Sequence, residues 1–435
     1  MDRRPIAAIL TLGCKLNLAD SEEIARALQA AGFATVDHLC EADAFVINTC
    51  SVTHVADAKS RRLVRSVRRL TPVAKVTVTG CFPQSAGETA ALELGADLVV
   101  GTRDSDKARL VDFLSAHLSA GDAASPDRPP AELRPAGSVH ARAFVKAQEG
   151  CNDVCAFCIV PQTRGREESR TIERVVAEVQ AAVESGAREV VVTGTQLGAW
   201  GRDLAEPLRP HHLIAGILER TDVARLRFSS LQPQDISPEL LGLWQDPRLM
   251  PHFHLALQSG SDGVLQRMRR RYSAREFILA AERIRAASPD AAITTDVIAG
   301  FPGETGPQFE ETMALCREVG FARLHCFPYS PRSRTAAVRM SGLAPSEVRK
   351  SRMGHLAALN DELSLAFRSR FLGSTRPVLW EFERQFEDGK RWFGHTDNYI
   401  GVYAASHAAR NQLVPVFLNA LYHDGVMGGC PTEEA

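Results

Sequence analysis

Between residues 140 and 368, short apolar runs alternate with longer segments of helical periodicity, and this repeat most restricts how the chain can fold. Alternating strands and helices form a parallel sheet covered by helices. The expected helices include Ile172–Ser185, Ala274–Ala287 and Ser346–Arg370. Six such units predict an open, partial (β/α)6 barrel, with functional groups at the carboxyl ends of its strands. We expect those strands at Ala143–Gln148, Glu189–Thr193, Arg225–Ser230, His252–Leu257, Ile293–Ile298 and Arg323–Phe327.

The segment before this repeat shows the same alternation of short apolar runs and helical periodicity, over fewer residues. Its helical periodicity covers Asp20–Ala31, Ala56–Leu70 and Ser105–Leu118. The pattern predicts a separate domain with a parallel sheet. We expect its strands at Ile6–Leu12, Ala44–Asn48, Val76–Thr79 and Leu98–Val100.

Changes in composition mark both ends of the repeat. Residues 121–138 are rich in Pro, Ala, Asp and Gly, which is typical of a linker. After residue 370, short apolar segments separated by Gly, Asp and Asn predict a small all-β barrel. We therefore expect an α/β protein with domains at 1–120, 139–369 and 370–435, the first two joined by the linker 121–138.

The overall charge and hydropathy exclude some classes of function. The formal net charge is −1 over 435 residues, so binding of nucleic acid requires local basic patches. No stretch approaches the ~20 apolar residues that span a bilayer. The apolar run Ile6–Leu10 follows Arg3 and Arg4 but is shorter than a secretory core, and it is typical of a buried strand. We expect a cytoplasmic protein with no membrane partner, and a monomer because no long coiled coil is present.

Three of the ten cysteines lie in one loop after the first strand of the repeat, at Cys151, Cys155 and Cys158. In a reducing compartment, clustered cysteines indicate metal or redox chemistry rather than disulfides. Three thiolates in one loop can hold three corners of an iron–sulfur cubane and leave one iron open. The alternative is a structural zinc ion, which normally needs four ligands, and no fourth cysteine or histidine is near in sequence.

A second set of three cysteines lies in the first domain. Cys14, Cys50 and Cys81 each follow the end of a predicted strand. Because the carboxyl ends of parallel strands lie along one edge, these thiols can meet there and hold a second cluster. The alternative is that they are three small buried apolar residues.

With Phe157 before its last cysteine, the loop resembles the signature of the radical S-adenosylmethionine superfamily. The whole chain resembles the methylthiotransferase family, which combines an N-terminal three-cysteine domain, a radical core and a C-terminal TRAM barrel. The resemblance implies S-adenosylmethionine and two [4Fe–4S] clusters as cofactors, held through the two cysteine sets. It also rests on the segments Phe228–Ser230, His254–Ser261 and Thr295–Glu304. The cofactor-binding residues that we expect from it are Thr193, Gly194, Ser230, Gln258, Asp296 and Gly300.

Three branches of this family differ in substrate. Two modify tRNA, at threonylcarbamoyladenosine or at isopentenyladenosine, and one modifies an aspartate of a ribosomal protein. The segments Thr11–Asn17, with Lys15 as the sharpest feature, Ile47–Arg61 and Gly394–Ile400 resemble the threonylcarbamoyladenosine branch. That resemblance implies methylthiolation at C2 of the adenine next to the anticodon, by a 5′-deoxyadenosyl radical and sulfur from the first-domain cluster. It also implies tRNA, an electron donor of the flavodoxin or ferredoxin type and a sulfur donor as partners, and no catalytic residue beyond the cluster ligands.

Basic patches could supply the contacts to tRNA phosphates, although a run of charges is more often only a solvated surface. A predicted helix carries Lys59, Arg61, Arg62, Arg65, Arg68 and Arg69, and a loop carries Arg267, Arg269, Arg270 and Arg271. The barrel combines aromatic and basic residues, as small RNA-binding barrels do. Two other classes stay open from the residues alone: a radical enzyme that acts on a small molecule, and a zinc protein that binds RNA.

Overall fold

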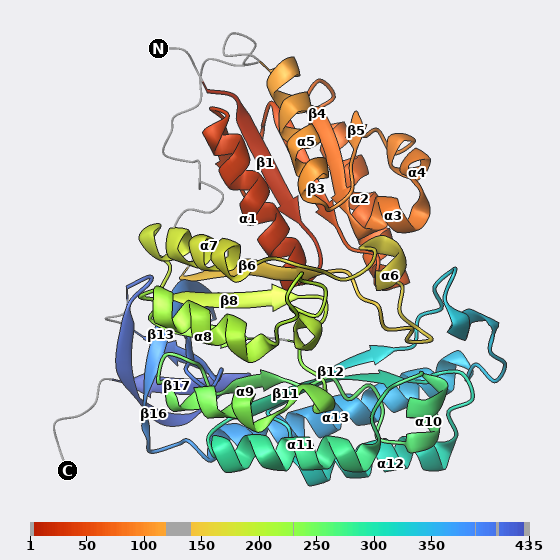
Figure 1. Cartoon of the computed structure of the whole chain (residues 1–435), viewed down its shortest axis with the longest axis vertical. Coiled ribbons are helices and arrows are strands. Elements are labelled where there is room, and N and C mark those ends of the chain that lie inside the picture. Colours follow the sequence, from red (N-terminus) through yellow and green to blue (C-terminus); the bar gives the residue numbers. More distant parts are fainter. Residues whose placement is uncertain (1–3, 119–140, 229, 388, 406–408, 430–435) are drawn as a thin grey trace. The chain divides into compact units, whose positions relative to one another are not determined.

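The structure is a computed structural model, and it describes residues 4–118, 141–228, 230–387, 389–405 and 409–429 (Figure 1). These residues fall into two compact units, which are described separately. Unit 1 comprises residues 1–138, 149–153 and 158–167, and unit 2 comprises the rest. The predicted linker 121–138 lies outside the described residues. The predicted domain bounds stay a prediction.

Unit 1 contains a five-stranded parallel sheet with the strand order β2-β1-β3-β4-β5. This confirms the predicted parallel-sheet domain. Its strands are β1 (Ile6–Thr11), β2 (Ala34–Val36), β3 (Ala44–Thr49), β4 (Lys75–Gly80) and β5 (Leu98–Val99). Its helices are α1 (Lys15–Ala30), α2 (His54–Leu70), α3 (Cys81–Ala86), α4 (Glu88–Leu92), α5 (Asp104–His117) and the short α6 (Val160–Thr163).

Alternation of side chains along the strands explains why helices cover both faces of this sheet. Ala7 and Ile9 of β1 pack in one apolar cluster with Leu28 of α1 and Leu110 of α5. The intervening residues Ile6, Ala8 and Leu10 pack in a second cluster that includes Val64 and Val67 of α2. Successive side chains of a strand point to opposite faces, so a continuous apolar strand such as β1 needs cover on each side.

The core of unit 2 confirms the predicted partial (β/α)6 barrel. Its strands form the sheets β7-β6-β8-β9 and β10-β11-β12, and isolated bridges at Leu226↔Leu249 and Leu231↔Leu255 join β9 to the second sheet. The strands are β6 (Arg142–Glu149), β7 (Glu168–Ser169), β8 (Glu189–Gly194), β9 (Arg225–Phe228), β10 (His252–His254), β11 (Ala292–Ala299) and β12 (Arg323–Pro328). The helices are α7 (Ile172–Glu184), α8 (Pro210–Arg220), α9 (Pro238–Gly242), α10 (Asp262–Arg267), α11 (Ala274–Ala287), α12 (Gly306–Val319) and α13 (Ser346–Ser369).

Two core strands end earlier than the sequence pattern predicts. The expected strand Arg225–Ser230 ends at Phe228, and the expected strand His252–Leu257 ends at His254. Ser230 has φ 69° and Gln258 has φ 66°. At Ser230 this left-handed conformation prevents the strand from continuing, whereas Gln258 lies beyond the predicted end at Leu257 and does not account for the earlier end of β10 at His254.

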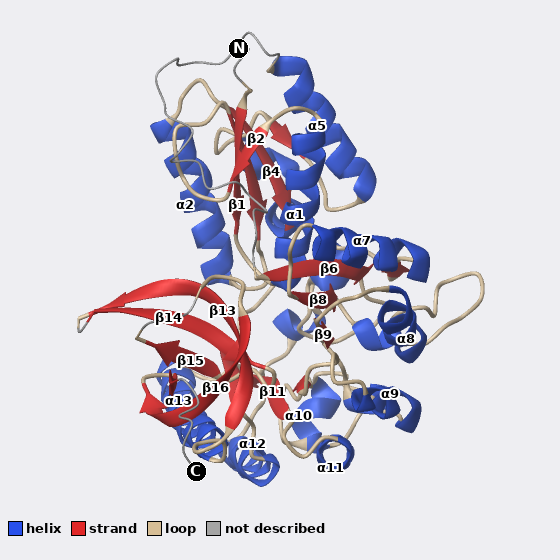
Figure 2. Ribbon diagram, turned by 90° about the vertical axis from the view of Figure 1, so that its left-hand side faces the viewer, coloured by secondary structure: helices blue, strands red, loops and turns tan. Residues whose placement is uncertain are grey.

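The C-terminal part of unit 2 is a closed barrel with the strand order β13-β14-β15-β17-β16 (Figure 2), which confirms the predicted all-β barrel. Val378, Val402, Val416, Leu418 and Val426 fill its interior. The last strand is rich in glycine and has no clear apolar run in the sequence. The strands are β13 (Thr375–Phe386), β14 (Gly389–Thr396), β15 (Gly401–Ala404), β16 (Leu413–Tyr422) and β17 (Gly425–Gly429).

Within unit 2, a buried group of charges joins this barrel to the core. Glu189, the first residue of β8, is 0% exposed. Its carboxylate lies 2.8 Å from Nε of Arg227 and 3.1 Å from Nε of Arg225. Both arginines also donate to Thr396 O of the barrel, over 2.9 and 2.6 Å. The barrel therefore sits on the core through charged groups that water does not reach.

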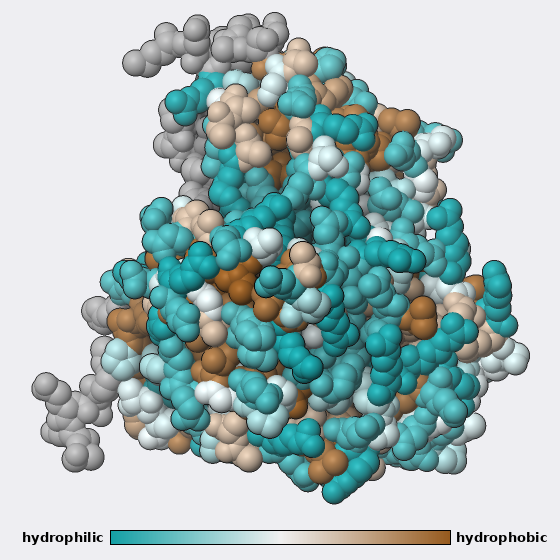
Figure 3. Space-filling view, in the orientation of Figure 1, coloured by the Kyte–Doolittle hydropathy of each residue, from teal (hydrophilic) through white to brown (hydrophobic). Residues whose placement is uncertain are grey.

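The surface gives no sign of a membrane-spanning helix. Within the described ranges, no helix is both long enough and apolar enough to cross a bilayer. On the face shown in Figure 3, hydrophobic residues occur in separate small groups among hydrophilic ones. Scattered exposed apolar residues of this kind are normal on a folded protein.

Candidate functional site

The three first-domain cysteines lie at the carboxyl ends of three neighbouring strands. Cys14 follows β1 and precedes α1, Cys50 follows β3 directly, and Cys81 follows β4 and begins α3. Burial raises the pKa of Cys50 to about 11, and the neighbouring thiols of Cys81 and Cys14 contribute to this rise. The parallel sheet thus brings the three thiols together, as the spacing predicted.

Close packing of the backbone keeps these cysteine turns in place. Gly80, before Cys81, has φ 95°, and a Cβ there would lie 2.3 Å from Thr49 O. A Cβ on Gly13 would lie 3.0 Å from Cys50 Cβ. Only glycine tolerates both the left-handed backbone and this close approach. A substitution at either glycine would separate the turns that carry the thiols.

Buried amides link the first two turns. Asn17 donates from Nδ2 to Asn48 Oδ1 over 2.8 Å and to Thr49 O over 2.9 Å. Asn48 donates back to Asn17 O over 2.8 Å, and the Cys14 thiol donates to Asn17 Oδ1 over 3.3 Å. Buried polar groups that satisfy one another in this way rigidify a site.

A buried arginine lies beside these thiols within unit 1. Arg164 is 4% exposed and pairs with Glu149 at 2.7 Å and Asp20 at 3.0 Å. Burial raises the pKa of Cys81, and the positive charge and hydrogen bond of Arg164 oppose that rise. Three facing thiols next to a fixed cation suit thiolate ligands, so the donor set fits an iron–sulfur cluster with three protein ligands.

The same side chains do not surround a single metal ion. Among the described residues, no group of three or more His, Cys, Asp or Glu side chains is arranged to hold one ion. A cubane cluster differs because each of its ligands binds a separate iron, which spreads the thiols farther apart.

The second cysteine loop is fixed by backbone hydrogen bonds in each unit. In unit 1, Cys151 N donates to Gly165 O over 3.1 Å. In unit 2, Ala156 N donates to Met268 O over 2.9 Å, and Ala337 N donates to Ala156 O over 2.7 Å. Cys151, Cys155 and Cys158 are all partly exposed. Partly exposed thiols in an anchored loop can accept both a cluster and a further ligand.

The aromatic residue of this loop packs on the core of unit 2. Phe157 meets Phe301 edge to face, with ring centroids 6.4 Å apart, and Phe301 meets Tyr329 in the same way at 5.4 Å. Phe301 follows β11 and is fully buried. This contact ties the cysteine loop to the turn Gly300–Glu304.

The residues expected to bind S-adenosylmethionine all lie in or just after parallel strands of unit 2. Thr193 and Gly194 end β8, Ser230 follows β9, Gln258 follows β10, and Asp296 and Gly300 lie in and after β11. Ser230 and Gln258 are non-glycine residues with positive φ. Such strain persists only where the surroundings enforce it, and it gathers at binding sites. Whether these residues bind the cofactor stays a prediction.

A buried ion pair shapes the last of these turns. Gly300 N donates to Glu304 Oε2 over 2.7 Å, and Arg352 of α13 pairs with the same oxygen at 2.5 Å. Burial raises the pKa of Glu304, and Gly300 and Arg352 oppose that rise. Gly300 was predicted from the sequence but Arg352 was not, because 52 residues separate the two positions.

Two histidines that were not predicted as site residues from the sequence, His254 on β10 and His325 on β12, lie near the predicted Asp296 on β11. His254 lies 3.3 Å from Asp296 through Nε2 and 3.1 Å from Thr294 through Nδ1. The ring of His325 lies 5.7 Å from that of His254. Polar residues at alternate positions of otherwise apolar strands were the signal that could have revealed this group.

The predicted basic patches are only partly available for RNA. On α2, Arg68 is held by Gly95 O, Ala74 O and Asp97. In the second patch, Arg267 donates to Gly303 O and Gln308. Exposed positions of α2 remain at Lys59, Arg61, Arg62, Arg65 and Arg69.

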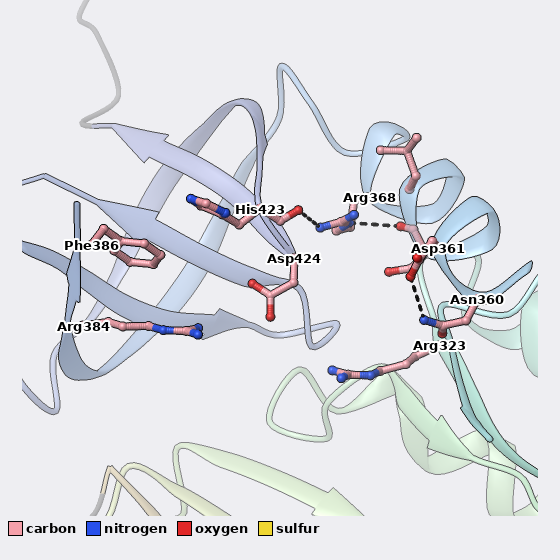
Figure 4. Close-up of a pocket in the computed structure, with 10 residues that line it drawn as sticks. Arg323, Asn360, Asp361, Arg368, Arg384, Phe386, His423 and Asp424 are labelled. Carbon is pink, nitrogen blue, oxygen red and sulfur yellow. Dashed lines mark hydrogen bonds between the residues drawn. The ribbon is translucent and has the colours of Figure 1, made fainter. Parts of the chain in front are cut away.

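A pocket of about 610 Å³ lies in unit 2 between α13, the start of β12 and the barrel. Figure 4 shows Arg384 and Arg323 pointing toward each other from opposite sides, with the Asp424 carboxylate between them. Against the effect of burial, the hydrogen bond from Tyr403 lowers the pKa of Asp424, and the charges of both arginines lower it further. Arg323 begins β12, at the end of that strand opposite the carboxyl edge. None of the predicted cluster ligands or cofactor-binding residues lines this pocket.

Comparison with known proteins decides between the functional classes left open above. Residues 7–101 match the uncharacterized protein family UPF0004, and residues 145–316 match the radical SAM superfamily. The chain is 36% identical over 409 residues, 91% of its length, to threonylcarbamoyladenosine tRNA methylthiotransferase MtaB of Bacillus subtilis, and covers 89% of that protein. The chain belongs to the radical S-adenosylmethionine methylthiotransferase family. Membership implies S-adenosylmethionine and [4Fe–4S] clusters as its cofactors.

Relatives from a second branch of the family are equally similar. The chain is 38% identical over 389 residues to tRNA-2-methylthio-N(6)-dimethylallyladenosine synthase of Cereibacter sphaeroides, covering 86% of each protein. In fold, it resembles the radical S-adenosylmethionine methyltransferase TsrM of Kitasatospora setae, with a TM-score of 0.56, 14% identity and 77% of each chain covered. The relatives establish the family but not the modified nucleoside.

Proposed function

We propose that this family member attaches a methylthio group to C2 of N6-threonylcarbamoyladenosine in tRNA. The observation that carries the methylthiolation reaction is the presence of two three-cysteine sets in one chain, one along a parallel-sheet edge and one in a loop before a partial β/α barrel; the choice of nucleoside rests on the relatives named MtaB. One set is suited to sulfur chemistry, and the other is suited to cleavage of S-adenosylmethionine.

In this proposal, Cys14, Cys50 and Cys81 hold the auxiliary cluster, and Cys151, Cys155 and Cys158 hold the cluster that binds S-adenosylmethionine. When bound, these groups supply the one-electron chemistry that removes hydrogen from an unactivated carbon. The protein's part is to position and shield them. Glu304 and Arg352 shape one cofactor turn, and Asn17 and Asn48 fix the auxiliary thiols.

Polar groups in the core favour threonylcarbamoyladenosine over the dimethylallyl substrate. The threonylcarbamoyl group carries a carboxylate and a hydroxyl, whereas the dimethylallyl group is apolar. The rings of His254 and His325 and the carboxylate of Asp296 form a polar surface there, which suits the former group better than the latter. Relatives named as MtaB in Thermotoga maritima and Chlamydia pneumoniae, at 35% and 34% identity, agree with this preference.

Nucleoside analysis tests the substrate directly. Anaerobically reconstituted protein with dithionite, S-adenosylmethionine and sulfide is expected to convert threonylcarbamoyladenosine in tRNA to its 2-methylthio derivative. Mass spectrometry of digested tRNA measures the product. Product on dimethylallyladenosine tRNA alone would contradict the substrate and retain the reaction. Formation of 5′-deoxyadenosine without any modified nucleoside would contradict both tRNA substrates.

The exposed cations of α2 lead to a prediction about tRNA binding. Reversing two charges in Arg62→Glu/Arg65→Glu is expected to weaken binding and to reduce the slope of log affinity against log salt by about two, because each lost phosphate contact removes about one. Filter binding at several salt concentrations measures this slope. The matched control is Arg275→Glu/Arg283→Glu, which reverses two exposed charges on α11. Equal slopes for both variants would show that α2 does not contact tRNA.

A further inference from the structure

We infer that Arg270 is a positioning residue that raises the reduction potential of the cluster held by Cys151, Cys155 and Cys158. The inference rests on the proposed function for the cluster ligands, and it concerns one side chain of unit 2. In the sequence, Arg270 belongs to a run of arginines that was considered as a contact surface for tRNA phosphates. The structure gives this one member of the run a different partner.

The guanidinium of Arg270 contacts a predicted cluster ligand. Its Nη1 lies 3.2 Å from Cys155 Sγ and donates a hydrogen bond to it. Arg270 is partly buried, whereas Arg269 and Arg271, its neighbours in the chain, are exposed. Arg270 therefore points toward the cysteine loop with a donor in range.

The other two nitrogens of the guanidinium are also held. Nη2 donates to Gln232 Oε1 over 2.9 Å, and Nε donates to Tyr272 Oη over 3.0 Å. The guanidinium carbon lies 4.9 Å from the centroid of the Tyr272 ring. An arginine fixed at all three nitrogens loses little further freedom when it binds sulfur, so the contact to Cys155 is part of the fold.

The anchors of Arg270 are themselves rigid. The buried hydroxyl of Tyr272 donates to Leu257 O over 2.8 Å and contacts Ala256 O at 2.5 Å. Met268, two residues before Arg270, accepts the backbone hydrogen bond from Ala156, next to Cys155. The thiol and the guanidinium therefore belong to one hydrogen-bonded group and keep their separation.

Electrostatics fixes the sign of the effect. Reduction adds one negative charge to a cluster, and a nearby cation stabilises the more negative state. Hydrogen bonds to the sulfurs and the local net charge are among the factors that set cluster potentials. Arg270 supplies both at Cys155 and therefore makes the cluster easier to reduce.

A redox titration tests this inference on the reconstituted full-length protein. Arg270→Met is expected to lower the midpoint potential enough to change the oxidised-to-reduced ratio at least tenfold, which is about 59 mV for a one-electron couple. Electron paramagnetic resonance follows the reduced cluster, and the change of its signal with added S-adenosylmethionine identifies it. Arg270→Lys keeps the positive charge but loses the planar guanidinium, so a smaller decrease in the midpoint potential is expected.

Two further variants make the result decisive. Arg269→Gln removes a neighbouring charge whose side chain makes no hydrogen bond within the described residues, and it should leave the potential unchanged. Gln232→Met frees one anchor of Arg270 without touching the thiol, and it should lower the potential by less than Arg270→Met. If the Arg270→Met protein does not bind a cluster, the midpoint potential of the Gln232→Met protein tests the inference by itself.

Equal potentials in the wild-type, Arg270→Met and Gln232→Met proteins would overturn the inference, as would equal decreases in the Arg269 and Arg270 variants. The readout does not involve tRNA. A potential shift without any modified nucleoside would therefore retain the role of Arg270 and reject the proposed substrate.

Discussion

Cys155→Ala protein is expected to form no 5′-deoxyadenosine, whereas Cys50→Ala protein is expected to form it and to leave tRNA unmodified. The reason is the division of the cysteines into two sets. Removing one of three thiolates from a cluster with an open iron removes the site that S-adenosylmethionine needs. Removing a thiolate from the sheet edge of unit 1 leaves the S-adenosylmethionine site intact but removes the auxiliary cluster that is proposed to deliver sulfur.

Iron content and product analysis measure both halves of this expectation. Each variant should lose about four of about eight irons per chain, since each set is proposed to hold one four-iron cluster. Liquid chromatography quantifies 5′-deoxyadenosine in the same samples. Cys326→Ala is the matched control, because this partly buried thiol belongs to neither set. Formation of 5′-deoxyadenosine by Cys155→Ala protein at the wild-type rate would refute the assignment of the radical cluster.

The sequence was sufficient to predict the architecture because the architecture depends on local periodicity. Strands such as Glu189–Gly194 contain a short run of valines and end in glycine, and long helices such as Ala274–Ala287 have clear caps. Parallel order then follows from the alternation itself. The same reasoning brought Cys14, Cys50 and Cys81 to one edge, because each directly follows a strand or its turn.

Long-range side-chain contacts could not be predicted in the same way. Arg164 reaches Asp20 across 144 positions, and Arg270 reaches Cys155 across 115. Nothing in the periodicity distinguishes Arg270 from the exposed Arg269 beside it. Their roles depend on which way each side chain turns once the loop has folded, and that is decided by partners elsewhere in the chain such as Gln232.

The second large effect is expected from the charges that join the barrel to the core of unit 2. Glu189→Gln is expected to destabilise this unit by about 3 to 5 kcal/mol, because the substitution leaves buried arginines without their counter-charge. Arg225 and Arg227 are 2% and 1% exposed, so water cannot solvate them in its place. Differential scanning calorimetry should show a melting point lower by about 10 °C.

The same carboxylate gives the effect a distinct pH dependence. Burial alone would raise the pKa of Glu189, but Arg227, Arg225 and Arg142 lower it to about 2. A carboxyl with a lowered pKa stabilises the fold above its unfolded pKa, and that contribution is lost as pH falls toward the folded pKa. The difference in free energy of unfolding between wild type and Glu189→Gln should therefore have its full value at pH 7. This difference should shrink as pH falls from about 4.5 toward 2.

Other ionisable groups beside Glu189 also contribute to the pH dependence of stability. Arg142 also pairs with Glu381 at 2.9 Å and donates to Tyr399 Oη over 3.0 Å, and His395 bonds Glu381 at 2.5 Å. Comparing the two proteins at each pH cancels the titration of these shared groups. Glu173→Gln is the matched control, because Glu173 pairs with Arg220 on the surface at 3.5 Å, and it should change the melting point little. A constant gap between wild type and Glu189→Gln down to about pH 3 would mean that the buried arginines do not depend on the charge of Glu189.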